Sequence, residues 1–242
     1  MMHPNEAKWR QWSFRIGTWM HRPVPHKIRS IRSKLGSVID MLEDALFSKR
    51  YGVNCSGFIE KHDLKTAHIT ALPHSQAYQA VTCTAIRELL GEALKTDVEF
   101  DNFIDLGSGK GKACFFASTM NRFKMLVGVE FSAQLVEISK TNADRFGKEN
   151  IVFINDDAAR YRLPTGTNLI FLFNPFGEAI LREFLENNIE HFRKNRSMIA
   201  YSNDQHRHRI MQAGFATIFR NQETQGSLYQ HFDHNVSSAS AP

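Results

Sequence analysis

Two segments of this 242-residue chain combine glycine and acidic residues in a spacing that suits the binding of a charged nucleoside. Residues 105–111 read Asp-Leu-Gly-Ser-Gly-Lys-Gly and stand between an apolar run and a helical pattern. Residues 126–130 form a second apolar run, which ends in Glu130. Glycine permits a sharp turn from strand to helix and lets a ligand approach the main chain near the positive end of the helix. Acids at the ends of the apolar runs favour a ligand that carries positive charge.

Other glycine-rich loops fit these residues less well. The dinucleotide fingerprint requires G-x-G-x-x-G, and the position of its third glycine is here Lys112. Asp105 would also lie beside the pyrophosphate of a nicotinamide cofactor, which makes an NAD-dependent oxidoreductase the less favoured alternative. A P-loop is excluded, because it needs four residues between its glycines, followed by Gly-Lys and then Ser or Thr.

Residues 105–111 resemble motif I of the class I S-adenosylmethionine-dependent methyltransferases. The resemblance implies that S-adenosyl-L-methionine is the cofactor and that Asp105, Gly107, Gly109 and Gly111 bind it. It also implies that Glu130 binds the ribose hydroxyls and that the adjacent Phe131 belongs to the same site.

The resemblance extends to three further segments. Asp156 and Asp157 follow the apolar residues 151–154, as in the third strand ending of the family, where an acid meets the adenine amino group. Asp157 is the implied contact, and Asp156 stands where the family commonly has glycine. Residues 50–57 and 172–177 resemble an uncharacterised bacterial subgroup, in which a tyrosine at the position of Tyr78 lies near the methionine end of the cofactor.

The segment Asn174-Pro-Phe176 is the candidate site for the methyl acceptor. The Asn174 amide oxygen could accept a hydrogen bond from an amino group, and Phe176 could stack on a planar group or enclose a cation. Nitrogen methylation of a small molecule or a protein amine is therefore favoured, against a purely structural Asx-Pro turn. A catalytically inactive, cofactor-binding regulatory or scaffold protein is the other alternative. No metal site is predicted, since the histidines near residues 62–74 and 206–208 lack ligand spacing.

Alternating apolar runs and helical patterns predict an α/β fold with a doubly wound, mostly parallel seven-stranded sheet and an N-terminal helical extension. The expected strands lie near residues 102–106, 125–130, 151–155, 168–173, 197–202, 215–220 and 227–232. The expected helices lie near residues 28–47, 75–94, 110–120, 133–146, 178–192 and 204–213. The predicted organisation is a basic arm (1–35), a helical segment on the substrate side (36–95), a cofactor-binding domain (96–234) and a disordered tail (235–242).

The basic character of the chain is confined to its N-terminal arm. Residues 1–36 contain eight Lys or Arg and one acid, which gives this arm a net charge of +7. Because the whole chain has a net charge of +5, the remaining residues are slightly acidic. Trp9, Trp12, Ile16 and Trp19 share a helical face, which suits packing on the protein or a second copy, a membrane surface or nucleic acid. Three cysteines without paired spacing and the lack of a signal peptide or transmembrane run predict a cytoplasmic protein.

Overall fold

The computed structural model describes residues 26–64, 77–173 and 176–231, together with their side chains except those of residues 26–35 and 61. The chain divides into two compact units, residues 1–41 and 42–242, and helix α2 (His26–Tyr51) crosses the boundary between them. The predicted tryptophan-bearing helix of the arm, His68, His74, Asn174 and the tail lie outside the described residues.

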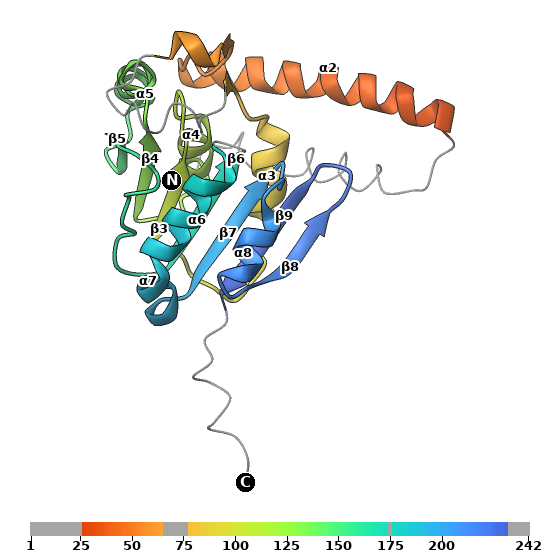
Figure 1. Cartoon of the computed structure of the whole chain (residues 1–242). Coiled ribbons are helices and arrows are strands. Elements are labelled where there is room, and N and C mark those ends of the chain that lie inside the picture. The colour runs from red at the N-terminus through yellow and green to blue at the C-terminus, as the bar shows by residue number, and fades with distance from the viewer. Residues whose placement is uncertain (1–25, 65–76, 174–175, 232–242) are drawn as a thin grey trace. The chain divides into compact units, whose positions relative to one another are not determined.

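A seven-stranded sheet forms the centre of the second unit (Figure 1), in the order β5-β4-β3-β6-β7-β9-β8. The first five strands in this order are parallel, and β9 runs antiparallel between β7 and β8. The doubly wound, mostly parallel sheet predicted for this region is therefore confirmed, and its antiparallel strands lie together at one edge. The strands are β3 (Asn102–Leu106), β4 (Met125–Glu130), β5 (Ile151–Asn155), β6 (Asn168–Phe173), β7 (Ser197–Ser202), β8 (Phe215–Asn221) and β9 (Gly226–His231).

Apolar side chains on both faces of the central strands explain why the sheet is covered on both sides. Phe103 and its neighbours on one face pack with helices α3, α4 and α5, whereas Ile104 and its neighbours on the other face pack with α6, α7 and α8. Both Phe103 and Ile104 are fully buried. The helices are α3 (Cys83–Ala93), α4 (Lys112–Ser118), α5 (Ala133–Phe146), α6 (Glu178–Asn187), α7 (Ile189–Lys194) and α8 (Arg207–Gln212).

The helix predicted over residues 75–94 is wrong in its first part. Strand β2 (Tyr78–Gln79) pairs antiparallel with β1 (Phe58–Ile59), which lies where the sequence predicts neither a helix nor a strand. A short 3₁₀ helix (Lys61–Asp63) follows β1. Helix α3 begins only after Thr82, whose hydroxyl accepts a hydrogen bond from the backbone N–H of Ala85 at 3.2 Å. This cap satisfies a backbone donor of the first turn and fixes the later start.

The helix predicted over residues 178–192 consists of two helices, α6 and α7, which are separated at Asn188. The Asn188 side chain donates to the carbonyl oxygens of Tyr161 and Phe184 and accepts from the N–H of Leu163, in each case at 2.9 Å. Because this amide binds the backbone of Tyr161 and Leu163 outside the helix as well as Phe184 within α6, the chain turns here instead of continuing one helix.

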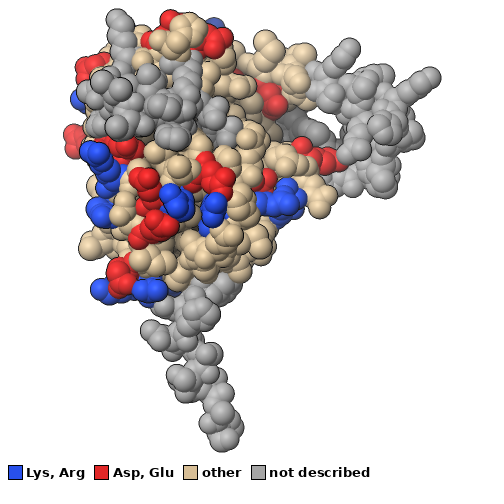
Figure 2. All heavy atoms as spheres, in the orientation of Figure 1, with Lys and Arg blue, Asp and Glu red and all other residues tan. Residues whose placement is uncertain are grey.

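Charges on the face seen in Figure 2 are mixed, with Lys and Arg beside Asp and Glu over the described part of that face. No helix among the described residues is long and apolar enough to cross a membrane.

Candidate active site

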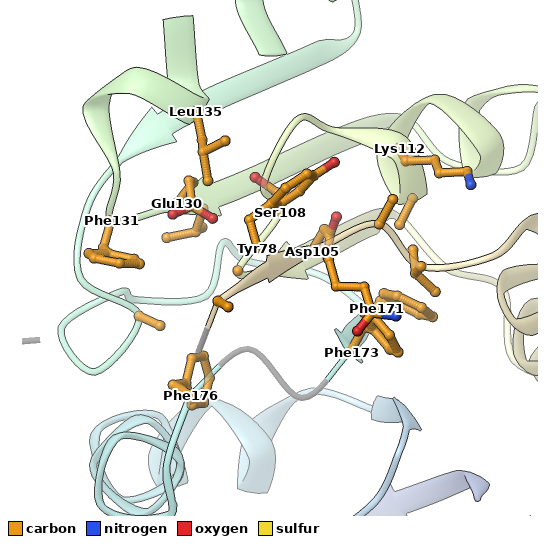
Figure 3. Close-up of a pocket in the computed structure, with 18 of the residues that line it drawn as sticks. Tyr78, Asp105, Ser108, Lys112, Glu130, Phe131, Leu135, Phe171, Phe173 and Phe176 are labelled. Carbon is orange, nitrogen blue, oxygen red and sulfur yellow. The ribbon is translucent and has the colours of Figure 1, made fainter. Parts of the chain in front are cut away.

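A pocket of about 230 Å³ lies at the carboxyl ends of the parallel strands (Figure 3). Strand order reverses beside β3, and open α/β sheets bind ligands at such a point. The ends of β3, β4 and β5 contribute an acidic half to this pocket. The ends of β6 and β7, with the start of α6, contribute an aromatic half. The acidic half contains Asp105, Glu130, Asp156 and Asp157, and the aromatic half contains Phe171, Phe173, Phe176, Ile180 and Asn203.

The glycine loop between β3 and α4 requires glycine at its centre. Gly109 has a φ of 54°, and a Cβ added there would lie 2.4 Å from the ring of Tyr78. A side chain at this position would therefore meet a buried aromatic ring as well as an unfavourable backbone conformation. The loop is joined to the next strand, because the N–H groups of Gly107 and Ser108 both donate to the carbonyl oxygen of Val129, at 2.8 and 3.1 Å.

Glu130 links the glycine loop to the start of helix α5. One of its carboxylate oxygens accepts from the N–H of Gly109 and the other from the N–H of Ser132, both at 2.9 Å. The side chain is almost fully buried, and this burial raises its pKa, while the backbone hydrogen bonds act in the opposite direction. A carboxylate has about four lone-pair sites, so Glu130, which lines the pocket, can still accept a hydrogen bond from a ligand.

Asp105 has a different environment, although it lies on the neighbouring strand. Its side chain is 4% exposed, and none of the described residues donates a hydrogen bond to it. Burial, with a further contribution from the charge of Glu130, raises the pKa of Asp105. A buried carboxylate without a donor is costly, so this position favours a ligand that brings a positive charge.

Asp156 and Asp157 also line the pocket, at the end of β5. Asp157 is buried and accepts a hydrogen bond from the N–H of Ala159 at 3.0 Å, while Asp156 accepts from the N–H of Asp157 at 2.8 Å. Both carboxylates thus stabilise the turn after the strand. Phe131, next to Glu130, lines the same half of the pocket.

A segment N-terminal to the sheet covers the glycine loop. The hydroxyl of Tyr78 donates to the carbonyl oxygen of Cys55 at 2.7 Å, and its ring lies against Gly109. The Asn142 amide of α5 donates to the carbonyl oxygens of Asn54 and Lys110, both at 3.1 Å. These bonds join the covering segment, the glycine loop and α5.

The aromatic half lies across Asp105 from Glu130. In Figure 3, Phe171 and Phe173 stand on one side of Asp105 and Glu130 on the other, as the strand order requires. Phe176 is buried and lines this half, and its role toward an acceptor stays a prediction. The structure therefore brings Tyr78, Phe131, Phe176 and the four carboxylates to one pocket.

A protein-family model described as a methyltransferase domain matches residues 98–233, which is more than half of the chain. The chain belongs to this family. The recognition of the chain as a methyltransferase is thus confirmed, whereas the roles of residues 105–111 and the likeness to the bacterial subgroup stay predictions.

Solved structures similar to this methyltransferase domain are distant from it. A ribosomal protein L11 methylase from Lactobacillus delbrueckii subsp. bulgaricus is 12% identical over 61% of this chain and 77% of its own, with a TM-score of 0.46. M. capricolum TrmK in complex with S-adenosyl-homocysteine is 14% identical over 62% and 71%, with a TM-score of 0.43. An rRNA methylase from Streptococcus thermophilus is 15% identical over 61% and 91%, with a TM-score of 0.41. The comparison with curated proteins found no match.

Three polar pocket residues of the methyltransferase domain are absent from the sequence-based set. The Ser108 hydroxyl is buried and has no hydrogen-bond partner among the described residues. Lys112 is buried and forms an ion pair of 2.6 Å with Asp44 of α2. Asn203 directly follows β7. The sequence could have indicated Asn203 in the same way as Glu130. Glu130 ends one apolar strand and Asn203 directly follows another, at the same end of the sheet.

The basic turn near residue 206 has a structural role outside this pocket. His208 Nε2 lies 3.0 Å from Glu178 Oε1, and Arg209 contacts the same carboxylate at the start of α6. Among the described residues, no group of three or more His, Cys, Asp or Glu could hold a metal ion.

Proposed function

We propose that this protein uses S-adenosylmethionine to methylate a nitrogen atom of a small molecule or a protein amine. The observation that carries the proposal is the buried Asp105 carboxylate, which has no donor among the described residues and faces a pocket with a glycine loop. A positively charged ligand would relieve its desolvation. S-adenosylmethionine carries an ammonium and a sulfonium, and the family of the chain implies this cofactor.

The residues of the acidic half fit this cofactor. Glu130 is held by backbone N–H groups and would accept hydrogen bonds from the ribose hydroxyls with its remaining lone pairs. Asp157 would accept a hydrogen bond from the adenine amino group, while Asp156 keeps the turn in place. Phe131 and Leu135 supply apolar surface for the base. Tyr78 would cover the methionine end, because its ring lies on the glycine loop.

The aromatic half would align the acceptor. When bound, the cofactor supplies a methyl group on a positively charged sulfur, which an in-line nucleophile can attack. Phe173 and Phe176 exclude water and offer ring faces to a planar or cationic amine. Asn174 stands between them in the sequence and would accept a hydrogen bond from the amine, so that its lone pair is directed at the methyl group. Alignment and desolvation are then the main contributions of the protein.

Calorimetry tests the cofactor assignment. We expect S-adenosylhomocysteine to bind with a Kd in the micromolar range, near the values usual for enzyme ligands, and NADH to show no heat of binding. Tight binding of NADH in place of S-adenosylhomocysteine would support an oxidoreductase and contradict the proposal.

Methyl transfer tests the reaction itself. The protein and labelled S-adenosylmethionine are incubated with cell extract, and the label is then sought in protein, lipid, nucleic-acid and small-molecule fractions. We expect label in an amine of the protein or small-molecule fraction, and a reduced rate for Asn174→Ala. Binding of the cofactor without label in any fraction would instead support a regulatory or scaffold protein.

A further inference from the structure

Asn203 has an unusual backbone conformation at the edge of the pocket. It follows β7 directly, lines the aromatic half and has a φ of 58°. Residues other than glycine rarely adopt this left-handed conformation, although asparagine tolerates it better than most. Such conformations persist only where the surrounding structure enforces them, and they are concentrated at functional sites.

Two backbone hydrogen bonds hold the chain directly after the Cα atom of Asn203. The N–H of Asp204 donates to the carbonyl oxygen of Gln225 at 3.1 Å, and the N–H of Gln205 donates to the carbonyl oxygen of Asn203 at 2.8 Å. Gln225 has a φ of 55° and precedes the first residue of β9, which pairs with the last residue of β7. Two left-handed residues are thus joined across the end of the β7–β9 ladder.

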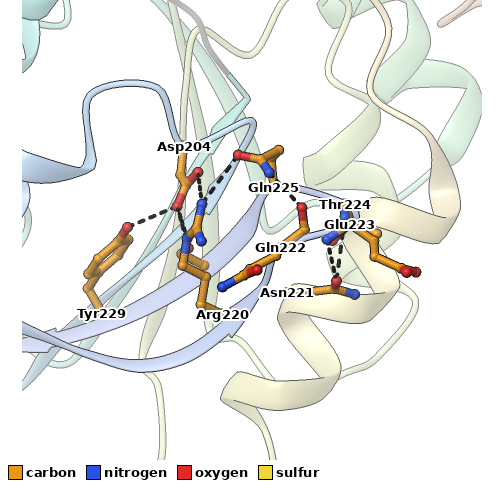
Figure 4. A network of polar contacts seen from close by, with 9 residues as sticks. Asp204, Arg220, Asn221, Gln222, Glu223, Thr224, Gln225 and Tyr229 are labelled. Atoms are coloured by element: carbon orange, nitrogen blue, oxygen red, sulfur yellow. Dashed lines mark hydrogen bonds and ion pairs between the residues drawn. The ribbon is translucent and has the colours of Figure 1, made fainter. Parts of the chain in front are cut away.

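The side chain of Asp204 fixes this arrangement (Figure 4). Asp204 is 3% exposed, and its carboxylate accepts from Arg220 Nε at 3.0 Å, Ser227 Oγ at 2.5 Å and Tyr229 OH at 3.3 Å. Arg220 also donates to Gln225 Oε1 at 3.3 Å. A charged, buried group with three donors resists displacement. Because Asp204 cannot shift, the residue before it is held in one position.

The turn after β8 is fixed from outside the sheet as well. Asn221 Nδ2 and Thr224 Oγ1 donate to the two carboxylate oxygens of Glu88 in α3, at 2.6 and 2.8 Å. The strand end that carries Asn203 is therefore supported by β8, β9 and α3 together.

Asn203 is a polar residue among the apolar side chains of the aromatic half. The other described residues of this half are Phe171, Phe173, Phe176 and Ile180, so Asn203 is the one side chain among them that can form hydrogen bonds. Its Oδ1 has a single long contact of 3.5 Å with Gln205 Nε2, and its Nδ2 has no partner among the described residues. An apolar site with a single polar group uses that group to orient and select its ligand.

We propose that the Asn203 carboxamide hydrogen-bonds the methyl acceptor beside the atom that is methylated, and that Asp204 is a positioning residue for Asn203. This inference rests on the proposed methyltransferase function. It assigns Asn203 to the acceptor and not to the cofactor, because the acidic half lies on the far side of β3 in the strand order. The acceptor accordingly has a polar N–H or carbonyl group next to a planar, apolar body.

Asn203→Gly is the decisive variant. Glycine adopts the left-handed conformation freely, so this substitution removes the carboxamide without straining the backbone. Asn121→Gly is the matched control, because Asn121 also has a left-handed backbone (φ of 51°) but precedes β4 at the opposite end of the sheet. Asn203→Asp is a second test variant that keeps the shape of the side chain and removes its donors.

The measurements are the Kd of S-adenosylhomocysteine by calorimetry and the initial rate of label transfer into the extract fraction that wild type labels. For Asn203→Gly we expect a transfer rate at least tenfold below wild type with a Kd within twofold of wild type. Asn203→Asp separates the two directions of the bond: its rate should fall as in Asn203→Gly where the acceptor offers a carbonyl, and should stay near wild type where the acceptor offers an N–H. Asn121→Gly should match wild type in both measurements. Melting temperatures identify any variant that fails to fold.

Asp204→Asn tests the role of the positioning residue. The acceptor concentration that gives half-maximal rate should rise, while the Kd of S-adenosylhomocysteine should stay at the wild-type value.

Three outcomes overturn the inference. Transfer by Asn203→Gly at the wild-type rate would show that the residue serves only the backbone turn, and would leave the proposed function intact. A tenfold weaker Kd of S-adenosylhomocysteine in this variant would assign Asn203 to the cofactor. Wild type that binds S-adenosylhomocysteine but labels no fraction would remove the proposed function, and the inference with it.

Discussion

The two halves of the pocket are built in different ways. In the acidic half, three of the four carboxylates accept hydrogen bonds from the main chain, as Glu130 does from Gly109 and Ser132, and Asp105 is the exception among the described residues. In the aromatic half, the surface consists of rings at the ends of β6 and β7, with Asn203 as the polar exception among the described residues. The acidic half therefore depends on a fixed backbone and on charge, whereas the aromatic half depends on shape. Substitutions should affect the two halves differently.

The largest effect is expected for Gly109→Ala, which acts on the backbone of the acidic half. Alanine is disfavoured by about 1–2 kcal/mol in a left-handed conformation, and its Cβ would lie 2.4 Å from the Tyr78 ring. We expect the free energy of unfolding to fall by about 2–4 kcal/mol in denaturant titrations. Gly91→Ala in α3 is the control. No atom lies within 4 Å of its added Cβ, so its stability should stay equal or rise by up to about 1 kcal/mol. Equal stability of the two variants would show that the loop can rearrange.

The second largest effect is expected for Glu130→Ala, which removes a charged hydrogen-bond acceptor from the acidic half. Two backbone donors lose their partner, and the ribose hydroxyls lose theirs in the proposed complex. The Kd of S-adenosylhomocysteine should weaken by about 2 kcal/mol, or roughly thirtyfold, in calorimetry. Glu137→Ala on the exposed surface of α5 should leave the Kd unchanged, since Glu137 forms only an exposed ion pair with Lys140. An unchanged Kd for Glu130→Ala would remove this residue from the site.

Much of the acidic half could be predicted because its residues follow from local rules. Asp105, Glu130 and Asp157 each close an apolar strand, and parallel strands bring their carboxyl ends together. The strand bounds were predicted closely for the same reason, since buried parallel strands are short apolar runs between turn residues. Glycine at alternate positions completed the pattern.

The remaining features depend on contacts between distant parts of the chain. Tyr78 was predicted within a helix, but it pairs in β2 and its hydroxyl bonds Cys55, 23 residues away. The ion pair between Lys112 and Asp44 joins elements 68 positions apart in the sequence. The left-handed backbone of Asn203 is supported by the hydrogen bond between the Asp204 N–H and the carbonyl oxygen of Gln225, 21 positions further along the chain and directly before β9. Local propensity contains none of these contacts, so the covering segment and the supports of the aromatic half required the structure.

A smaller effect, also specific to the acidic half, is expected from pH. Burial raises the pKa of Asp105 and of Glu130 above the ordinary carboxyl range, so the free protein holds a proton there at pH values where an exposed carboxyl is ionised. The ammonium group, which S-adenosylhomocysteine shares with S-adenosylmethionine, favours the ionised form of a carboxyl group beside it. Binding therefore releases a proton at low pH, and the affinity must rise with pH until the carboxyl is ionised in the free protein. We expect the Kd of S-adenosylhomocysteine to tighten by up to about tenfold between about pH 6 and about pH 8.

Asp105→Asn is the matched control for this pH dependence. The variant cannot ionise at this position, so its Kd should be weaker than that of wild type at pH 8 and should vary less with pH. The number of protons released on binding, measured by calorimetry in buffers of different ionisation enthalpy, should be smaller for Asp105→Asn than for wild type. A wild-type Kd that is constant over this range would show that Asp105 is already ionised in the free protein.

The smallest effect on cofactor binding is expected for Phe173→Leu in the aromatic half. Phe173 is partly exposed at the end of β6, and leucine keeps most of its apolar surface. The Kd of S-adenosylhomocysteine should stay within about twofold of wild type, which corresponds to less than about 0.5 kcal/mol. Label transfer to the acceptor should nevertheless fall, because the flat ring face is lost. Phe171→Leu, at a fully buried position of the same strand, should lower stability by about 1 kcal/mol or more. A tenfold loss of cofactor affinity in Phe173→Leu would mean that the two halves bind one ligand jointly, and the separation between them would then fail.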